Sequence, residues 1–270
     1  MLAHCLLRDN PWYRREAFMQ GLKAAGHDVV RRQPDKPDAN TLLVIWNRYG
    51  GNHDLATKVE AAGGVVVVAE NGYVSPNGGV PKFEVHPLGP RAHHYYSISQ
   101  GHHNDDSVKV VPDPFRFQSM RIELKPLRTK GKYVLVCPNR PFGVPERMMH
   151  PDWGVRCAER LRKKFGFTVR LRAHPGNDAP RIPLSDDLRE AQMVVIWSSS
   201  CGVHALAEGI PVVSEAPYWI CKQAAMPSVE TVFDEQAWSE KRLKAFEKLA
   251  CLQWTCEEIT NGEPFCRLLP

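Results

Sequence analysis

Two short stretches decide the fold: Thr41-Leu42-Leu43-Val44-Ile45-Trp46 in the first half of the chain and Lys132-Tyr133-Val134-Leu135-Val136-Cys137 in the second. Both are almost continuously apolar, which is typical of a strand buried on both faces of a parallel sheet. Further predicted strands, at 3–7, 65–69, 168–172, 193–197 and 211–214, alternate with segments of helical character, among them the basic helix predicted at 153–165. The alternation predicts an α/β fold with helices covering parallel sheets.

The 270 residues suit one large domain or two of about 130 residues. Between the two runs of strands and helices lies the segment 72–126, which is rich in Pro, Gly, His and Asn and holds only short strand candidates at 95–99 and 108–111. So long a segment indicates a functional role. We therefore predict two Rossmann-like domains facing across a cleft, 1–125 and 126–270, with the option that the final helix packs back on the first domain.

Basic residues are concentrated in the middle of the chain. The net charge is +5 overall, but 107–175 holds sixteen Lys and Arg against five Asp and Glu, which gives +11 there and −6 elsewhere. This asymmetry indicates either an anionic partner or a solvated helix face. No apolar run approaches the ~20 residues of a membrane span, and the N-terminus has no secretory pattern.

The cysteines and histidines do not have the spacing of metal sites. Eight cysteines include no C-x-x-C pair, so we expect reduced thiols and a cytoplasmic location. The adjacent pairs His93-His94 and His102-His103 also lack the spacing of zinc ligands. We therefore expect that the histidine pairs bind no metal. They would lie in a loop near a substrate that accepts a transferred group, or in a solvated loop.

Polar residues follow the predicted strands of the second half, where ligands bind in open parallel sheets. Arg140 follows one strand, Arg172 and His174 the next, and Ser198-Ser199-Ser200-Cys201-Gly202 a third. Hydroxyl and backbone N–H groups before a helix favour a phosphate, and arginine suits its oxygens; ordinary helix capping is the alternative. The loop is neither a Walker A loop nor G-x-G-x-x-G, which disfavours an ATPase or a dinucleotide oxidoreductase.

The first half carries a candidate general base. Glu70 directly follows Val65–Ala69, and a carboxylate at a strand end is held on a rigid scaffold; capping of the next turn is the alternative. Asp9 and Asp105 are the other candidate catalytic carboxylates. Other candidate ligand-contacting residues lie in loops of this half: Asn10, Arg48, Asn71, Tyr73, His102 and His103.

Four segments together resemble the capsule-polysaccharide, Kdo-transferase-like glycosyltransferases of the GT-B fold. They are Leu43-Val44-Ile45-Trp46, Val68-Ala69-Glu70-Asn71-Gly72-Tyr73-Val74, Arg172-Ala173-His174-Pro175, and Ser198-Ser199 followed by Ala205-Leu206-Ala207-Glu208-Gly209-Ile210-Pro211-Val212-Val213. Two positions depart from the family pattern: His204 stands where an acid is expected, and Asn71 where an Asp follows the Glu. The resemblance therefore implies sugar transfer rather than transfer of Kdo in particular.

The resemblance implies that the C-terminal half binds a nucleotide sugar and the N-terminal half the acceptor, without a tightly bound cofactor or metal. The donor residues would be Arg140, Arg172, His174, Ser198, Ser199, Ser200, Gly202, His204 and Glu208. We expect a UDP-sugar as the co-substrate.

Three functions remain open at this point. The charge of 107–175 suggests a polyanionic acceptor such as double-stranded DNA with hydroxymethylated pyrimidines, as modified by bacteriophage DNA glycosyltransferases in the cytoplasm of a bacterial host; reaching such a base requires extruding it. The alternative acceptor is a bacterial surface polysaccharide or lipid-linked glycan. A third possibility, of another class, is a non-catalytic protein that binds nucleotides or nucleic acid.

Overall fold

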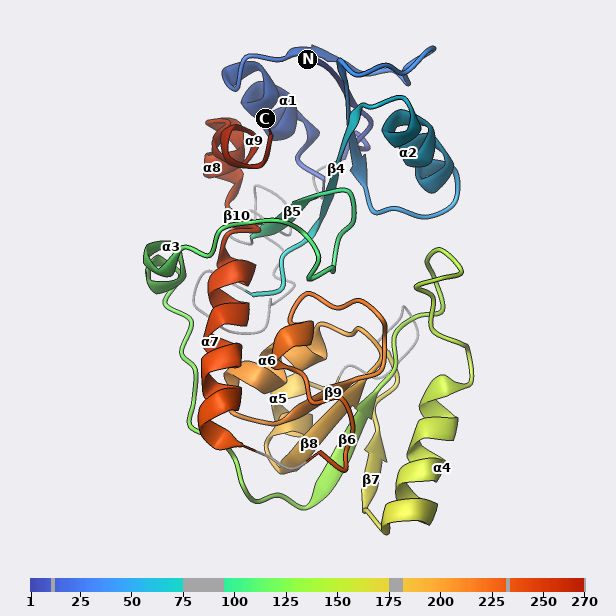
Figure 1. The fold of residues 1–270 in the computed structure, drawn as a ribbon, viewed down its shortest axis with the longest axis vertical. Coiled ribbons are helices and arrows are strands. Elements are labelled where there is room, and N and C mark those ends of the chain that lie inside the picture. Colours follow the sequence, from blue (N-terminus) through green and yellow to red (C-terminus); the bar gives the residue numbers. More distant parts are fainter. Residues whose placement is uncertain (11–12, 75–94, 175–181, 232–233, 270) are drawn as a thin grey trace. The chain divides into compact units, whose positions relative to one another are not determined.

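The structure is a computed structural model that describes residues 1–10, 13–74, 95–174, 182–231 and 234–269. The chain divides into two compact units (Figure 1). Unit 1 is Met1–His103, Ser107–Arg121 and Lys248–Pro270; unit 2 is Asn104–Asp106 and Ile122–Glu247. These bounds differ from the predicted 1–125 and 126–270 chiefly because the C-terminal segment belongs to unit 1.

Unit 1 contains a six-stranded sheet of order β10-β5-β4-β3-β1-β2. Strands β2, β1, β3 and β4 are parallel, β5 runs antiparallel to β4, and β10 runs antiparallel to β5. The strands are β1 (Leu2–Cys5), β2 (Asp28–Val30), β3 (Thr41–Trp46), β4 (Val65–Asn71), β5 (Tyr96–Gln100) and β10 (Gln253–Trp254). The helices are α1 (Arg15–Ala24), α2 (Gly51–Ala61), α3 (Pro114–Ser119), α8 (Cys256–Thr260) and α9 (Glu263–Leu268).

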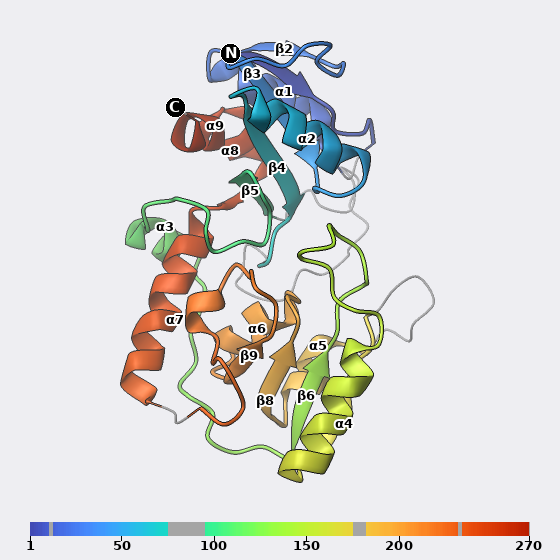
Figure 2. The same cartoon turned by 45° about the vertical axis from the view of Figure 1, so that its right-hand side comes forward.

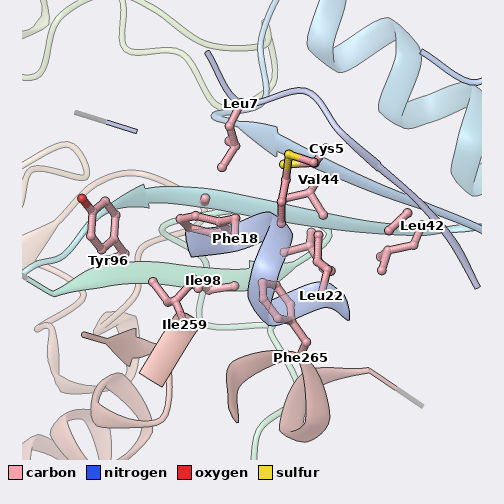
Figure 3. Packing of buried hydrophobic residues seen from close by; sticks show 14 of the residues in the cluster. Cys5, Leu7, Phe18, Leu22, Leu42, Val44, Tyr96, Ile98, Ile259 and Phe265 are labelled. Atoms are coloured by element: carbon pink, nitrogen blue, oxygen red, sulfur yellow. The ribbon is translucent and has the colours of Figure 1, made fainter. Parts of the chain in front are cut away.

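Strand β3 is buried on both faces, as its sequence predicts. Leu42 and Val44 pack into the cluster of Figure 3, which lies between the sheet and helices α1, α8 and α9. Leu43 and Ile45 point to the opposite face and pack against α2. The alternation of side chains along a strand sends neighbouring residues to opposite faces, so a strand covered on both sides must be apolar throughout.

The C-terminal segment packs against α1 and completes unit 1 (Figure 2). A Cβ atom on Gly21 of α1 would lie 1.7 Å from the Ile259 carbonyl oxygen of α8, so only glycine allows this approach. The Phe18 and Phe265 rings also meet edge to face, with centroids 6.2 Å apart. None of α3, α8, α9 or β10 was predicted.

Unit 2 contains a four-stranded, fully parallel sheet of order β7-β6-β8-β9. The strands are β6 (Tyr133–Cys137), β7 (Val169–Leu171), β8 (Ala191–Ile196) and β9 (Val212–Ser214). The helices are α4 (Trp153–Phe165), α5 (Leu184–Leu188), α6 (Cys201–Ala207), the 3₁₀ turn η1 (Lys222–Ala224) and α7 (Glu235–Ala250), whose last residues belong to unit 1. Helix α4 covers one face of the sheet through Trp153, Cys157 and Leu161.

The predicted α/β class with parallel sheets is confirmed, and the predicted bounds of β3 and α4 agree with those observed. The strand predicted at 108–111 is wrong, because these residues have irregular backbone. In the described ranges, we find no helix both long and apolar enough to cross a membrane.

Candidate functional site

The loops after β6 and β8 are joined at the carboxyl edge of the sheet in unit 2. The Asn139 amide donates from Nδ2 to Ser198 Oγ at 3.2 Å, and the Ser198 backbone N–H donates to Asn139 Oδ1 at 3.1 Å. The strands are parallel, so their carboxyl ends meet at one edge. The structure therefore brings together the second-half loops in which the sequence placed the site.

A segment from the middle of the chain joins this edge. Asn104 Nδ2 donates to the Ser198 carbonyl oxygen at 2.8 Å, and Asn104 Oδ1 accepts from the Ile220 N–H at 3.3 Å. Asn104 has a φ of +54°, a left-handed conformation that Asn tolerates better than most residues. Sequence reasoning missed Asn104, since an Asn within a polar loop carries no specific signal.

Asp105, predicted as a possible base, is buried and pairs with Arg147, with 2.6 Å between Oδ2 and Nη1. The Arg147 guanidinium in turn lies 4.0 Å from the centre of the Tyr218 ring. Asp105 thus helps to fix this part of unit 2.

Arg172 is held by a buried carboxylate. Its Nη1 pairs with Asp187, its Nη2 donates to the Ile182 carbonyl oxygen at 2.9 Å, and Arg170 pairs with the same Asp187 at 2.7 Å. The Asp187 side chain is only 3% exposed. Sequence reasoning missed Asp187, although Leu184, Asp187 and Leu188 fall on one helix face, which places an acid among apolar residues.

His174 and Arg140 are the exposed basic residues of the predicted donor set. Partial removal from water, followed by the guanidinium groups of Arg140 and Arg172, lowers the pKa of His174. The Arg140 guanidinium also lies 5.5 Å from the centre of the Phe142 ring. Three basic side chains from two strand ends therefore share one electrostatic environment. Pro175, which follows His174 in the resembling segment, lies outside the described residues.

The serine loop serves partly in capping. Ser199 Oγ accepts from the Cys201 N–H at 3.3 Å, whereas Ser200, the N-cap residue of α6, makes no side-chain cap hydrogen bond. Gly202 is required by packing, because a Cβ atom there would lie 2.7 Å from the Trp219 ring. The exposed Ser200 hydroxyl and half-buried Ser198 are the loop's accessible polar groups.

His204 and Glu208 lie farther along α6. His204 is buried, and burial lowers its pKa to about 4, with Glu208 opposing the shift. Glu208 follows the last turn of α6, where it pairs with Lys125 at 2.8 Å and Arg128 at 3.8 Å. Since α6 leads from the end of β8 back toward the start of β9, Glu208 lies at the opposite edge of the sheet from Ser198.

In unit 1, Glu70 and Asn71 end strand β4. Glu70 is half-buried and its Oε1 lies 3.3 Å from the Asn71 amide nitrogen, while Asn71 is exposed. Tyr73 is buried, and its N–H donates to Gln253 Oε1 at 2.8 Å. The C-terminal strand thus holds the backbone just beyond the candidate base.

Arg48 is a structural residue of unit 1. Its Nη1 donates to Glu60 Oε1 and to the Gly101 carbonyl oxygen, both at 2.7 Å, and its side chain is 4% exposed. An acceptor would have to displace these partners to reach the guanidinium.

The remaining predicted residues of unit 1 lie in turns. Asp9 is exposed and pairs with Arg15 at 2.6 Å, and Asn10 Oδ1 accepts from the Tyr13 N–H at 3.3 Å. His102 and His103 follow β5, and the His102 carbonyl accepts from the hydroxyl of Ser99 at 2.7 Å.

Among the residues that the structure describes, no group of three or more His, Cys, Asp or Glu side chains could hold a metal ion. His93 and His94 lie outside the described residues.

The basic excess of 107–175 is largely paired in the folded chain. Eleven of its sixteen Lys and Arg form ion pairs, most of them with acids from outside the segment. On α4, Arg160 pairs with Glu215 and Lys164 with Glu230. The charge asymmetry along the sequence therefore overstates the charge that the surface offers to a polyanion.

Comparisons with known proteins give a likeness in structure alone. No family model matches the sequence, and no curated protein matches it either. The beta Kdo 2,4 transferase of Thermosulfurimonas dismutans KpsC is similar with a TM-score of 0.51 and 12% identity, over 80% of this chain and 79% of that one. The beta Kdo 2,7 transferase of the same KpsC is similar with a TM-score of 0.51 and 13% identity, over 98% of each chain. Together with the two α/β units, these likenesses show a GT-B-like fold.

Proposed function

We propose that this chain is a glycosyltransferase that moves a sugar from a nucleotide-sugar donor to a hydroxyl group of a surface glycan. The observation that carries the proposal is the set of basic groups at the carboxyl edge of the sheet in unit 2. There the charges of Arg140 and Arg172 add to burial in lowering the pKa of His174. These groups follow strands whose neighbouring loops are joined by the hydrogen bond between Asn139 and Ser198.

These groups suit the phosphate end of a donor. Sugar transfer leaves negative charge on the departing phosphate, and fixed positive charges stabilise that charge as it develops. Arg140 supplies an exposed guanidinium, and Arg172 an oriented one, since Asp187 and Ile182 fix its position. His174 would take up a proton as a phosphate binds, because an anion favours the imidazolium form. This chemistry needs no metal, and a UDP-sugar is the first donor to test.

Glu70 is the proposed general base. It would remove the proton from the acceptor hydroxyl as the bond to the sugar forms. Its place at the end of β4, with the following backbone held by Gln253, gives the carboxylate a defined position in unit 1.

A glycan hydroxyl is the acceptor that the comparisons favour, because both similar structures are named as Kdo transferases. The DNA acceptor suggested by the charge of 107–175 has no support from these neighbours, and the ion pairs of that segment weaken its premise. Hydroxymethylated DNA is therefore included as a second acceptor in the transfer experiment described below.

The decisive experiment measures the melting temperature of the chain with UDP-, GDP-, CMP- and dTDP-sugars, since a ligand that binds only the folded state must stabilise it. We expect one nucleotide class to raise the melting temperature, and Arg140→Ala to reduce that shift. Absence of a shift with every donor would remove the nucleotide-sugar proposal.

Transfer is then measured with the stabilising donor and two acceptors, a capsule-type oligosaccharide and hydroxymethylated DNA. Product on the oligosaccharide supports the proposal; product on DNA alone would replace the glycan by DNA. Donor binding without transfer or hydrolysis would identify a non-catalytic nucleotide-binding protein.

A further inference from the structure

Two cysteines meet at the carboxyl edge of the sheet in unit 2. All eight cysteines of the chain are free thiols. Cys137 is the last residue of β6 and Cys201 the first of α6. A Cβ atom on Gly202, next to Cys201, would lie 2.6 Å from the side chain of Ile196, the register partner of Cys137, and each thiol shifts the pKa of the other. The chain therefore places two thiols in contact although 64 positions separate them in the sequence.

The contact follows from the sheet. Cys137 pairs in register with Ile196 of the neighbouring strand β8, and Cys201 comes shortly after that strand. The paired hydrogen bonds between Asn139 and Ser198 hold the two loops together at the same level. The thiols thus belong to a supported arrangement of two loops.

The two thiols have different surroundings. Cys137 is 1% exposed, whereas Cys201 is half-buried. The hydrogen bond from Cys137, opposed by burial and aided by Ser199 and Arg172, lowers the pKa of Cys201 to about 7; the same pairing and burial raise the pKa of Cys137. A thiolate is the reactive form of cysteine, so Cys201 is the nucleophile of the pair and Cys137 its protonated neighbour.

We propose that Cys137 and Cys201 are an oxidant-sensitive pair, which closes to an intramolecular disulfide when the protein meets hydrogen peroxide. The Cys201 thiolate attacks one peroxide oxygen, so that an S–O bond forms, the O–O bond breaks and hydroxide leaves. The Cys137 sulfur then attacks the sulfenic acid on Cys201; an S–S bond forms and the S–O bond breaks. The departing hydroxyl group takes the Cys137 proton and leaves as water. The two thiols lose two electrons and the peroxide gains them.

Closure would change the surroundings of Arg172. The Arg172 guanidinium helps to lower the pKa of Cys201, and a disulfide sulfur carries no negative charge to attract that guanidinium. The bond would also fix the first residue of α6 to the end of β6. The inference does not depend on the proposed function, because it concerns only the contact between the two thiols.

The test treats the full chain with hydrogen peroxide, blocks the remaining thiols with iodoacetamide, and maps the peptides by mass spectrometry. Digestion with trypsin and a protease that cuts after glutamate separates Cys201 from Cys221, because Glu208 lies between them. We expect a linked pair of peptides that contain Cys137 and Cys201, two hydrogens lighter than their sum and separated again by a reductant.

Cys157→Ser is the matched control, because Cys157 is also buried but neighbours Arg160 rather than another thiol. This variant should form the same cross-link, and Cys201→Ser should not. If the wild-type chain yields sulfinic acid at Cys201 without the cross-link, or cross-links only in urea, the proposal is overturned. These outcomes are read on the wild-type chain, so they stand even if Cys201→Ser does not fold.

Discussion

At the carboxyl edge of the sheet in unit 1, Arg48 has a side chain that is 4% exposed, and Glu60 and the Gly101 carbonyl occupy its Nη1. At the same edge of the sheet in unit 2, Arg172 is 13% exposed and is likewise held, by Asp187 and the Ile182 carbonyl. Both arginines follow a strand that is parallel to its neighbours, and both were predicted to contact a ligand.

The difference lies in what surrounds each arginine. Arg48 and Glu60 form a pair whose charges balance, so the site has no reason to attract an anion. Asp187 is shared by Arg170 and Arg172, which leaves a positive excess, and exposed Arg140 and His174 add to the basic character nearby. An arginine at a strand end is therefore informative about ligands only when its neighbours leave its charge uncompensated.

The largest expected effect separates the roles of the two units. Glu70→Gln in unit 1 should lower the transfer rate by about 10²–10⁴-fold, the usual contribution of a general base, and leave donor affinity nearly unchanged. Steady-state kinetics and calorimetry with the stabilising donor measure both. Glu257→Gln, which makes the same change at an exposed glutamate of unit 1, is the control; unchanged turnover in Glu70→Gln would remove Glu70 from the role of base.

The second effect concerns the two carboxylates that hold the arginines. Asp187→Asn leaves two guanidinium groups facing a neutral amide in a buried position, and we expect a loss of about 3 kcal/mol in the free energy of unfolding. Glu60→Gln, at a site where the acid is 39% exposed, should cost about 1 kcal/mol. Urea unfolding of both variants gives the comparison, and equal losses would contradict it.

The third effect is a loss of stability in acid. Burial lowers the pKa of His204 from 6.5 to about 4, so between these values the unfolded chain binds a proton that the folded chain does not. Stability from this group is therefore complete above pH 6.5 and falls as the pH drops, by about 3 kcal/mol near pH 4. His204→Gln should flatten this part of the pH profile of urea unfolding; an unchanged slope would show that other groups cause it.

The smallest effect compares residues at the two opposite edges of the sheet in unit 2. Arg140→Ala should weaken donor binding about tenfold, because a charge-assisted contact to phosphate is lost. Glu208→Gln should alter affinity much less, since Glu208 pairs with Lys125 at the opposite edge. Calorimetry compares the two variants, and a tenfold loss in Glu208→Gln would restore it to the donor site, as the family resemblance implies.

Much of the fold could be predicted from the sequence because its strands are buried on both faces. Thr41–Trp46 and Trp153–Phe165 have periodicities that depend only on local sequence, and their bounds were predicted as observed. The two residues of β10 are too few to form a pattern. Helix α8 did carry a local signal, the capping box of Thr255 and Glu258, in which each side chain bonds the other's backbone.

The candidate site was predictable only in its location. The loops after strands pointed to Arg172 and Ser198, because parallel strands end at one edge. The partners of these residues, Asp187 and Asn104, come from other segments, and pairing of this kind depends on tertiary packing. Likewise, Arg48 looked like a ligand-binding cation because its partner Glu60 lies one helix away.

The return of Lys248–Pro270 to unit 1 has a consequence for synthesis of the protein. Unit 2 is complete when Glu247 has emerged from the ribosome, whereas unit 1, which holds the N-terminus, still lacks β10, α8 and α9. We therefore expect the usual order, in which the N-terminal domain folds first during translation, to be reversed for this chain. Until Lys248–Pro270 arrives, the outer edge of β5 lacks its partner β10, and such an edge is open to association with other chains.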